Sequence, residues 1–413
     1  MAWELKKVED QRKELMEAYF EGSVTMKDLC KRFGISRKTA YKWIRRFTLL
    51  GMEGLKDLSK APHLPHRLFG DEEINLAITL KLQHRTWGPK KIHHKLKQYY
   101  PQLQVPSATR LYEIFKEHHL VSSRKLRSRV PATHPLETVN ESNDTWMADF
   151  KGWFLTQNNE KCEPFTLTDG FSRYLIKCTH LEHKSIEAVW DIIKEAFHEY
   201  GLPTRFRTDN GPPFGSTGVG RLTRLSINLI KAGVMPEWIH PGHPEENGRH
   251  ERMHLTLQQD IADPPAETLQ QQKRKMQRFQ REYNFERPHE ALCMQTPSSV
   301  YRVSTRTWDG KLRKPEYSSE STLIRKVGGN GCIRLGKDYF IGQTLSGEHI
   351  GLREVEQGFQ VYYGPIYLGR LVLGQGLEKP KIEGKNSYYA RNKSGLCPAP
   401  RQGLLALCKP GGG

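Results

Sequence analysis

Apolar residues recur at helical spacing in two stretches of the first third of the chain. The first stretch predicts three helices, over Glu9–Phe20, Met26–Phe33 and Arg37–Phe47. Thr25 and Ser36 stand where N-caps are needed, and Gly34 ends the second helix, where a left-handed residue costs little. Two helices joined by a short glycine turn are typical of the helix-turn-helix motif.

The second stretch has the same character. It predicts helices over Asp71–Arg85, Lys90–Tyr99 and Ser107–His118, with Ser107 as the cap of the last. Residues 60–70, with two prolines and two histidines, separate the two stretches and predict a linker. We therefore expect a second helix-turn-helix or winged-helix-like domain.

From Thr145 the pattern changes to alternating strands and helices. The predicted strands are Trp146–Phe154, Phe165–Thr168, Tyr174–Thr179, Thr204–Thr208 and Pro236–His240. The predicted helices are Ser185–Tyr200, Leu222–Lys231, Asn247–Asp260 and Glu267–Tyr283. Asp169-Gly170 is a hairpin signal between two of the strands. This succession predicts an α/β core with a mixed sheet.

Short strands broken by glycine turns follow the core. They are expected at Leu323–Val327, Cys332–Leu335, Tyr339–Gly342, His349–Val355, Phe359–Tyr363 and Ile366–Leu373. Such a series suggests a small antiparallel, SH3-like β-barrel. The remaining tail is rich in Gly, Pro and Lys and is expected to be disordered.

The chain is thus expected to be a multidomain protein, as its length of 413 residues also favours. The predicted domains are 1–59 (helix-turn-helix), 70–121 (second helical domain), 135–305 (α/β core), 318–374 (β-barrel) and 375–413 (tail). A basic connector, 122–130, precedes the core.

Charge adds a partner to this picture. The net charge is +18, and up to Val130 there are 27 Lys/Arg against 14 Asp/Glu. A concentrated positive surplus attracts polyanions by releasing their counterions, and DNA is the usual partner. A solvated basic surface remains the alternative.

The predicted helix Arg37–Phe47 has the two faces that a DNA-reading helix needs. Ala40, Trp43, Ile44 and Phe47 form a buried stripe. The other faces carry the candidate DNA contacts Arg37, Lys38, Tyr41, Lys42 and Arg45. In the second domain Thr109 and Arg110 are the corresponding candidates, on a less basic helix. A helical hairpin with a basic face is the alternative in both cases.

Several function classes are disfavoured. No run of 18 apolar residues occurs, and the N-terminus lacks the apolar stretch of a secretory signal, so no membrane association is expected. The seven cysteines are scattered without a C-x-x-C pair, which indicates neither a disulfide framework nor a zinc site. A reducing cytoplasm fits this composition best.

Three carboxylates carry the candidate chemistry. Asp149 lies within an apolar run, where a carboxylate is costly unless a cation compensates it. Asp209 directly follows a predicted strand, and Glu251 begins a predicted helix. Carboxylates on separate elements can hold the paired Mg²⁺ ions of phosphodiester chemistry. Taken singly, each has an ordinary explanation: a salt-bridged aspartate, an Asp-Asn-Gly turn and a surface pair with Arg252.

Five motifs in order strengthen the case. They are Trp146-x-x-Asp149, Asp169-x-x-Ser172-Arg173, Thr208-Asp209-Asn210-Gly211, Pro244-x-x-Asn247-Gly248-x-x-Glu251-Arg252 and Tyr283-Asn284-x-x-Arg287-Pro288-His289-x-Ala291-Leu292. Together they closely resemble the catalytic core of bacterial insertion-sequence DDE transposases related to retroviral integrases. The resemblance is specific over about residues 140–300, and the flanking domains fit the same architecture more loosely.

The resemblance implies an RNase H-like core in which Asp149, Asp209 and Glu251 are catalytic and hold two Mg²⁺ or Mn²⁺ ions. Water would attack a phosphate at each element end, and the freed 3′-hydroxyl would attack target DNA. The implied partners are double-stranded DNA, as terminal inverted repeats and target, and further copies of the chain. The implied location is the bacterial cytoplasm, at the nucleoid. Arg249, His250 and His254 could touch DNA beside the site, and Asn210 and Gly211 would shape the loop next to the metals.

Three departures from the family pattern stand out. The spacing between Asp209 and Glu251 is longer, with an extra stretch around Gly215–Leu222. Leu255 and Gln258 occupy positions where integrases often carry a basic residue. Histidines 93, 94, 118 and 119 have no paired cysteines nearby, so no zinc is expected.

Two neighbouring glutamates compete with Glu251 for the third position. Glu245 and Glu246 precede the turn-forming pair Asn247-Gly248 and are expected in a mobile loop. Asn247 is expected to cap the helix that carries Glu251, and a helical first turn holds a ligand more firmly. Two other functions remain open: a non-catalytic DNA-binding regulator, and an RNase H-like nuclease that cuts without joining.

Overall fold

The computed structural model describes residues 8–58, 69–121, 136, 138–240, 243–317 and 322–380. The chain divides into two compact units, residues 1–68 and 69–413. The predicted connector at 122–130 and most of the predicted linker at 60–70 lie outside the described residues. Among the described residues, no helix is both long enough and apolar enough to cross a membrane.

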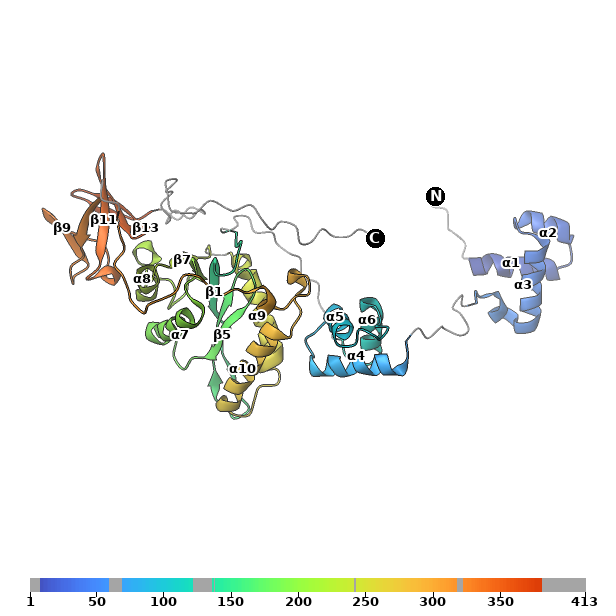
Figure 1. The fold of residues 1–413 in the computed structure, drawn as a ribbon. Coiled ribbons are helices and arrows are strands. Elements are labelled where there is room, and N and C mark those ends of the chain that lie inside the picture. Colours follow the sequence, from blue (N-terminus) through green and yellow to red (C-terminus); the bar gives the residue numbers. More distant parts are fainter. Residues whose placement is uncertain are drawn as a thin grey trace. The chain divides into compact units, whose positions relative to one another are not determined.

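The first unit is a cluster of three helices, as the apolar spacing predicts (Figure 1). They are α1 (Val8–Phe20), α2 (Met26–Arg32) and α3 (Arg37–Leu50), followed by a short 3₁₀ turn, η1 (Gly51–Leu55). Thr25 and Ser36 cap α2 and α3 through their hydroxyl oxygens, and Gly34 has a φ of 64°. Ala40 and Trp43 of α3 are buried in the core of this unit, together with Leu29 of α2. The other faces of α3 are therefore exposed to solvent.

The second unit begins with another three helices, α4 (Asp71–Gln83), α5 (Pro89–Tyr99) and α6 (Ala108–Glu117). They pack around the fully buried Trp87. Polar contacts tie the turn after α4 to the core that follows: His84 Nδ1 lies 2.7 Å from Glu282 Oε1, and Arg287 Nη1 donates to Thr86 Oγ1 at 2.8 Å. Arg287 is 5% exposed, so its guanidinium is shielded from solvent at this junction.

The core is a five-stranded mixed sheet in the order β5-β4-β1-β6-β7. The strands are β1 (Thr145–Phe150), β4 (Pro164–Asp169), β5 (Leu175–His180), β6 (Arg205–Thr208) and β7 (Met235–Trp238). Strands β1, β4 and β5 are antiparallel neighbours, whereas β6 runs parallel to β1, and β7 parallel to β6. This confirms the mixed sheet expected from the alternation of strands and helices.

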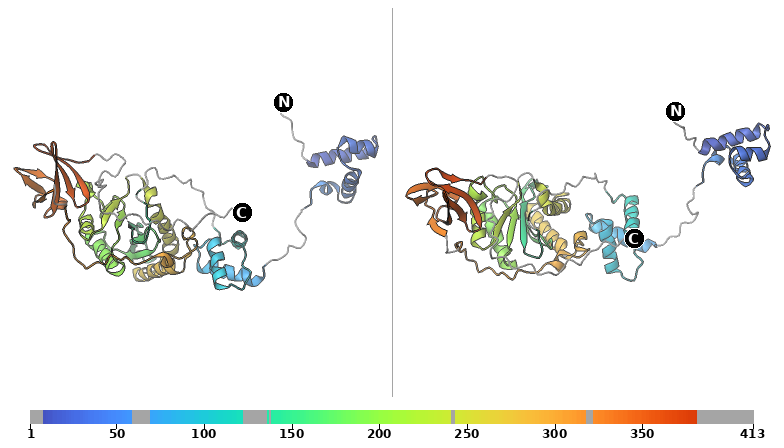
Figure 2. Two further views of the ribbon diagram at one scale, coloured as in Figure 1. Left: turned by 45° about the horizontal axis from the view of Figure 1, so that its top comes forward. Right: turned by 90° about the horizontal axis from the view of Figure 1, so that it is seen from above.

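Helices cover both faces of the sheet (Figures 1 and 2). On one face lie α7 (Ile186–Tyr200) and α8 (Arg224–Lys231), whose apolar residues join one buried cluster that also contains Trp146, Phe206 and Trp308. On the other lie α9 (Gly248–Leu257), the π-helical turn η4 (Gln258–Ala262) and α10 (Leu269–Phe285). Trp308 extends the core slightly beyond the predicted boundary at residue 305.

The structure corrects two predicted elements of the core. The predicted strand Trp146–Phe154 ends at Phe150, because the chain turns at Gly152, whose φ of 88° suits glycine. After that turn, β2 (Phe154–Leu155) and β3 (Lys161–Cys162) form a separate small hairpin. The predicted helix Asn247–Asp260 ends as a regular α-helix at Leu257 and continues as η4.

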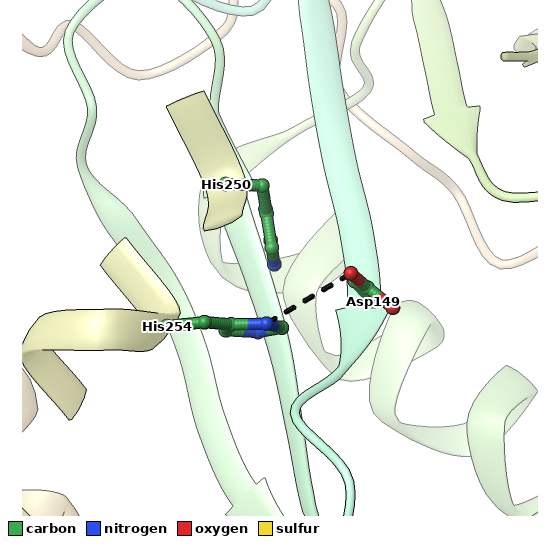
Figure 3. A group of neighbouring side chains, drawn as sticks. All are labelled: Asp149, His250 and His254. Carbon is green, nitrogen blue, oxygen red and sulfur yellow. Dashed lines mark ion pairs between the residues drawn. The ribbon is translucent and has the colours of Figure 1, made fainter. Parts of the chain in front are cut away.

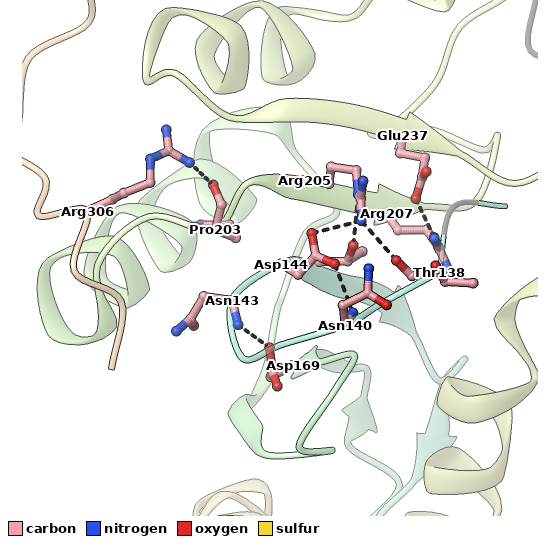
Figure 4. A network of polar contacts seen from close by, with 11 residues as sticks. Thr138, Asn140, Asn143, Asp144, Asp169, Pro203, Arg205, Arg207, Glu237 and Arg306 are labelled. Carbon is pink, nitrogen blue, oxygen red and sulfur yellow. Dashed lines mark hydrogen bonds and ion pairs between the residues drawn. The ribbon is translucent and has the colours of Figure 1, made fainter. Parts of the chain in front are cut away.

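A polar network fastens the beginning of β1 to its neighbours (Figure 4). Asp169 accepts a hydrogen bond from the Asn143 backbone N–H at 2.8 Å, and also binds the Ser172 N–H and hydroxyl. Arg205 bridges to Asp144 at 2.8 Å, which links β6 to the same end of β1. Asp169 of the Asp-x-x-Ser-Arg motif is therefore a structural residue at the end of the sheet opposite Asp149.

The C-terminal region is a small antiparallel β domain. Its main sheet has the order β14-β13-β12-β11-β8, and β9 and β10 form a separate two-stranded ribbon. The strands are β8 (Thr322–Lys326), β9 (Cys332–Leu335), β10 (Lys337–Phe340), β11 (His349–Val355), β12 (Gly358–Tyr363), β13 (Ile366–Val372) and β14 (Gly376–Glu378). An antiparallel sheet is confirmed, whereas closure into a barrel stays a prediction.

Strand β14 corrects the predicted start of the tail. Residues 376–378 pair with β13, with Leu377 opposite Leu371, instead of beginning a disordered segment. The main chain of β13 offers an edge there, and pairing with it satisfies backbone groups that would otherwise face solvent. The remainder of the predicted tail, from residue 381, lies outside the described residues.

Candidate active site

The strand register brings Asp149 and Asp209 together. β1 and β6 are parallel, with Thr145 opposite Arg205 and Met147 opposite Arg207. Continued by two residues, this register sets Asp149 beside Asp209, where adjacent strands are about 4.8 Å apart. Both aspartates are thus at the carboxyl ends of neighbouring parallel strands, the edge where α/β proteins form their sites.

Helix α9 presents one face to these strands. Asn247 Nδ2 donates to Asp149 Oδ2 at 3.3 Å, and His254 Nδ1 lies 3.8 Å from the same oxygen. Glu251 lies between these two residues, four positions after Asn247 and three before His254, so it shares their face of the helix. Glu251 therefore comes close enough for its charge to raise the pKa of Asp149, whereas the ligand atoms that lie within 4.8 Å of one another are those of Asp149, His250 and His254.

The electrostatics of Asp149 reflect this crowding. Burial raises the pKa of Asp149, and the charges of Asp209 and Glu251 raise it further, to about 7. The pKa of Asp209 is also raised, mainly by burial, although the Gly211 N–H and Lys184 oppose the shift. A buried carboxylate whose pKa is raised by neighbouring carboxylates lacks a sufficient counter-charge. Such a cluster favours a bound cation.

The residues present fit divalent metal ions. All three carboxylates offer hard oxygen atoms, the ligands that Mg²⁺ and Mn²⁺ prefer. Asp149 is 22% exposed and Glu251 lies at the surface, so a solvated ion and a phosphate can reach them. The loop after Asp209 is shaped for close approach: the Gly211 N–H donates to Asp209 Oδ1 at 3.2 Å, and a side chain at Gly211 would stand 3.2 Å from Asp209 Oδ2.

A second arrangement of possible ligands overlaps this one. Atoms of Asp149, His250 and His254 lie within 4.8 Å of one another (Figure 3). Both imidazoles contact the hydroxyl of Thr166, at 2.7 Å each. Burial lowers the pKa of His254 to about 3 and that of His250 far below its usual range, so both rings are neutral.

The histidines are placed differently from the sequence-based expectation. His250 is 1% exposed and His254 7%, and both face the sheet, so neither is available to DNA in this structure. They are buried because α9 lies flat on β4, which the sequence pattern does not reveal. Arg249 is exposed, and its Nη1 donates to the Gly170 carbonyl at 2.8 Å.

Thr166 and Asn247 are the site residues that sequence reasoning missed. Thr166 lies opposite Asp149 in the antiparallel register. No local signal in the sequence pointed to Thr166, because β1 and β4 are joined through residues 151–163 and not by a tight turn that would fix their register. Asn247 was expected to cap α9, but it makes no side-chain cap bond and turns to Asp149 instead.

The competing glutamates also depart from expectation. They lie in a 3₁₀ turn, η3 (Pro244–Asn247), rather than in an irregular loop. The Glu246 side chain is 1% exposed and binds the backbone N–H of His240 at 2.7 Å and its Nδ1 at 2.6 Å. Glu246 is therefore committed to the end of β7, which leaves Glu251 to approach Asp149.

The candidate DNA contacts of the first unit lie at the surface. Arg37, Lys38, Tyr41, Lys42 and Arg45 are all exposed on α3. Within the described residues, none of these four basic side chains forms an ion pair. On α6, Thr109 is exposed, but Arg110 is paired with Glu113 at 3.0 Å and Glu117 at 3.4 Å. The two helices thus differ in the positive charge that they leave free.

Family comparisons agree with this arrangement. Residues 139–244 and residues 232–297 each match an integrase core domain family. Residues 11–63 match a helix-turn-helix domain, and residues 39–134 a homeodomain-like domain. The integrase core matches together span Asp149, Asp209 and Glu251.

Individual relatives come from mobile elements. The uncharacterized protein of insertion element IS476 from Xanthomonas euvesicatoria is 27% identical over 231 residues, which is 56% of this chain and 64% of the relative. The transposase for transposon Tn552 from Staphylococcus aureus is 23% identical over 276 residues, 61% of this chain and 56% of the relative. The chain therefore spans less than two thirds of the length of these two relatives.

The chain also matches solved integrase structures at low identity and low TM-score. The simian T-cell lymphotropic virus intasome with PP2A regulatory subunit B56 gamma has 15% identity and a TM-score of 0.36, covering 74% of this chain and 95% of that chain. The HTLV-2 integrase catalytic core with magnesium has 15% identity and a TM-score of 0.31, covering 39% and 98%. The sequence matches identify an integrase core domain behind helix-turn-helix domains, and relate the chain to transposases and insertion-element proteins.

Proposed function

We propose that the chain is a DNA transposase that binds the ends of its element, cleaves their 3′ ends and joins them to target DNA. The observation that carries this proposal is the position of Asp149 and Asp209 at the carboxyl ends of neighbouring parallel strands, with burial and the charges of Asp209 and Glu251 raising the pKa of Asp149 to about 7. The integrase core matches and the relatives from mobile elements support it.

The N-terminal helices bind DNA in this proposal. Arg37, Lys38, Lys42 and Arg45 of α3 are exposed and form no ion pair within the described residues, so phosphates can approach them without displacing a carboxylate. Tyr41, Lys42 and Arg45 would face the major groove, as in other helix-turn-helix proteins. Thr109 on α6 is a further contact candidate, whereas Arg110 would first have to leave its glutamates.

The three carboxylates hold two divalent ions, Mg²⁺ or Mn²⁺, in the reactive centre. Bound there, the ions supply charge stabilisation for the attacking and leaving oxygens of an in-line phosphoryl displacement. Asp149 and Asp209 are fixed by their strands, and Glu251 by the first turn of α9. Asn247 holds Asp149 Oδ2 from the other side, which orients that carboxylate before DNA arrives.

Two displacements at the same centre complete the reaction. In the first, a water oxygen bonds to the phosphorus at the element end and the 3′-oxygen leaves as a hydroxyl. In the second, that 3′-hydroxyl bonds to a target phosphorus and displaces the adjoining target 3′-oxygen. In each step one oxygen on the phosphorus is replaced by another, from water in the first step and from the 3′-hydroxyl in the second. No oxidant and no covalent enzyme intermediate are needed. Paired insertion of two ends requires two such centres, hence a homo-oligomer acting at bacterial DNA in the cytoplasm.

The test is a cleavage and joining assay on the inverted repeats that flank the coding sequence, with a plasmid target. With Mg²⁺ we expect nicking at the 3′ ends followed by joined products, and neither product in excess chelator. Glu251→Gln is expected to bind the ends and do neither, whereas Glu246→Gln keeps activity if it folds. Cleavage without joining would overturn the proposal in favour of a nuclease, and end binding without cleavage in favour of a regulator.

A further inference from the structure

The hydroxyl of Thr166 makes three polar contacts beside Asp149. Its Oγ1 lies 3.1 Å from the backbone oxygen of Asp149, 2.7 Å from His250 Nε2 and 2.7 Å from His254 Nε2. A hydroxyl has one hydrogen to donate and two lone pairs to accept with. Three contacts therefore use its full capacity, and the direction of each can be worked out.

The backbone oxygen of Asp149 decides the directions. A carbonyl oxygen can only accept, so the Thr166 hydroxyl hydrogen points to it. Both imidazoles must then donate from Nε2 to Thr166 Oγ1. A neutral imidazole carries one ring hydrogen, so with Nε2 protonated each Nδ1 has a lone pair.

The two lone pairs meet different surroundings. Nδ1 of His250 lies 3.0 Å from Thr168 Oγ1, whose single hydroxyl hydrogen goes to this nearer acceptor rather than to the Met147 carbonyl at 3.5 Å. Nδ1 of His254 lies 3.8 Å from Asp149 Oδ2, which is too far for a hydrogen bond. A lone pair that faces a carboxylate oxygen is unfavourable unless a cation lies between the two.

The separation suits a metal ion. Divalent ions bond to carboxylate oxygen and imidazole nitrogen at about 2.0–2.2 Å. Two such bonds span up to about 4.3 Å when collinear, so 3.8 Å corresponds to a bent bridge. Asn247 already donates to Asp149 Oδ2 at 3.3 Å, which leaves that oxygen one direction for a metal bond.

We propose that Nδ1 of His254 is a nitrogen ligand of a divalent ion bound to Asp149. The Thr166 hydroxyl fixes the tautomer that makes this possible, and His250 helps to hold Thr166 without binding the ion. Because imidazole suits first-row transition ions and Mg²⁺ prefers oxygen, the site favours Mn²⁺ or Co²⁺ over Mg²⁺ relative to a site made of carboxylates alone. This assignment rests on the proposed function only in requiring an ion at Asp149.

The test uses the full chain loaded with Mn²⁺ and pulsed electron paramagnetic resonance. A directly bound imidazole gives the Mn²⁺ signal a ¹⁴N coupling, which changes to ¹⁵N when the protein is grown with ¹⁵N-histidine. His254→Gln is the decisive variant, since its amide can still donate to Thr166 while Nδ1 is gone. His250→Gln is the matched control from the same cluster, and should keep the coupling.

We expect the coupling in wild type and its loss in His254→Gln, with Mn²⁺ affinity weakened about 10- to 100-fold and Mg²⁺ affinity changed much less. Carboxylate-dependent Mn²⁺ binding in wild type without any nitrogen coupling would overturn the assignment of His254 alone. Mn²⁺ binding that is the same in wild type and Asp149→Asn would overturn the metal site of the proposed function. The labelled wild type keeps the test decisive even if a variant fails to fold.

Discussion

Charge is used in opposite ways on α3 and at the carboxylate cluster. On α3, Arg37, Lys38 and Lys42 are exposed and lack ion partners among the described residues. In the core, Asp149 is largely buried, and the nearby charges of Asp209 and Glu251 raise its pKa further. Exposed like charges are weakened by salt and cost little to keep, whereas buried ones destabilise the protein until a ligand neutralises them. The first region is suited to binding DNA, the second to holding a reactive ion.

The second helical domain falls between these extremes. Arg110 on α6 is neutralised by two glutamates, and the turn after α4 is fastened to the core by His84, Thr86 and Arg287. Its charges are used within the protein. This domain is therefore better placed to position the core than to supply most of the affinity for DNA.

The largest effect is expected from a mutation in the carboxylate cluster, which should abolish cleavage and leave DNA binding intact. Asp209→Asn should reduce cleavage about 1,000-fold or more, because several kcal/mol of transition-state stabilisation depend on the bound ions. The affinity for the element ends should stay within twofold of wild type, since Asp209 is not part of the basic helix α3. Cleavage rates under single-turnover conditions and gel-shift affinities measure the two quantities. Loss of binding in Asp209→Asn would break the division of roles.

A large effect on stability is expected at Asp149 when metal is absent. Its folded pKa of about 7 exceeds the unfolded value of 3.8, so the folded state holds the proton more tightly. Stability of the metal-free wild type should accordingly fall as pH rises from about 4 to 7. Asn carries no charge at any of these pH values. The free energy of unfolding of Asp149→Asn should therefore rise relative to that of wild type over this range, by at most about 4 kcal/mol.

Urea unfolding in chelator at pH 5 and pH 8 measures this difference. We expect the advantage of Asp149→Asn to be larger at pH 8, and to shrink when Mg²⁺ is added at pH 8. An advantage that is equal at both pH values would show that Asp149 is not held in an unfavourable charged state.

A smaller effect is expected from the exposed cations. Arg37→Ala and Lys42→Ala should each weaken end binding about tenfold at physiological salt, and lower the slope of log affinity against log salt by about one. Cleavage at saturating protein should be unchanged, because α3 carries none of the three carboxylates. Salt titrations of both variants against wild type check this. An unchanged salt slope would mean that neither side chain meets a phosphate.

The smallest effect is expected on α6. Arg110→Ala should change end binding less than about threefold, because the charge it removes is already paired with Glu113 and Glu117. Glu113→Ala is the informative companion, since it frees the arginine in part and should leave binding unchanged or slightly stronger. If Arg110→Ala were as damaging as Lys42→Ala, the contrast between α3 and α6 would not hold.

Local features could be read directly from the sequence. The caps Thr25, Ser36 and Ser107 stand at the helix starts that they predict, because a cap depends only on the next three residues. The grouping of Asp149 with Asp209 was expected only from the family resemblance, because it depends on which strands are neighbours in the sheet. Burial of His250 and His254 could not be predicted, since it depends on which side of α9 meets β4.

The stretch around Gly215–Leu222 shows what local reasoning misses. The longer spacing raised doubt about the geometry near the carboxylates. In the structure Val219 and Leu222 pack with residues of the C-terminal β domain, and a side chain at Gly220 would meet Leu368 at 2.8 Å. Arg221, in the same stretch, donates from Nη1 to Oδ1 of Asn210 at 2.8 Å, and Asn210 is next to Asp209. The stretch thus joins the β domain to the loop after β6, a long-range contact that sequence spacing alone does not encode.

The central claim is that Asp149, Asp209 and Glu251 together hold divalent ions. Anomalous X-ray diffraction from crystals of the full chain grown with Mn²⁺ tests it most directly. We predict anomalous peaks within bonding distance, about 2.0–2.4 Å, of all three carboxylates, and none there in crystals of Asp149→Asn. Mn²⁺ bound elsewhere in the protein, with these three side chains lacking any peak, would contradict the account.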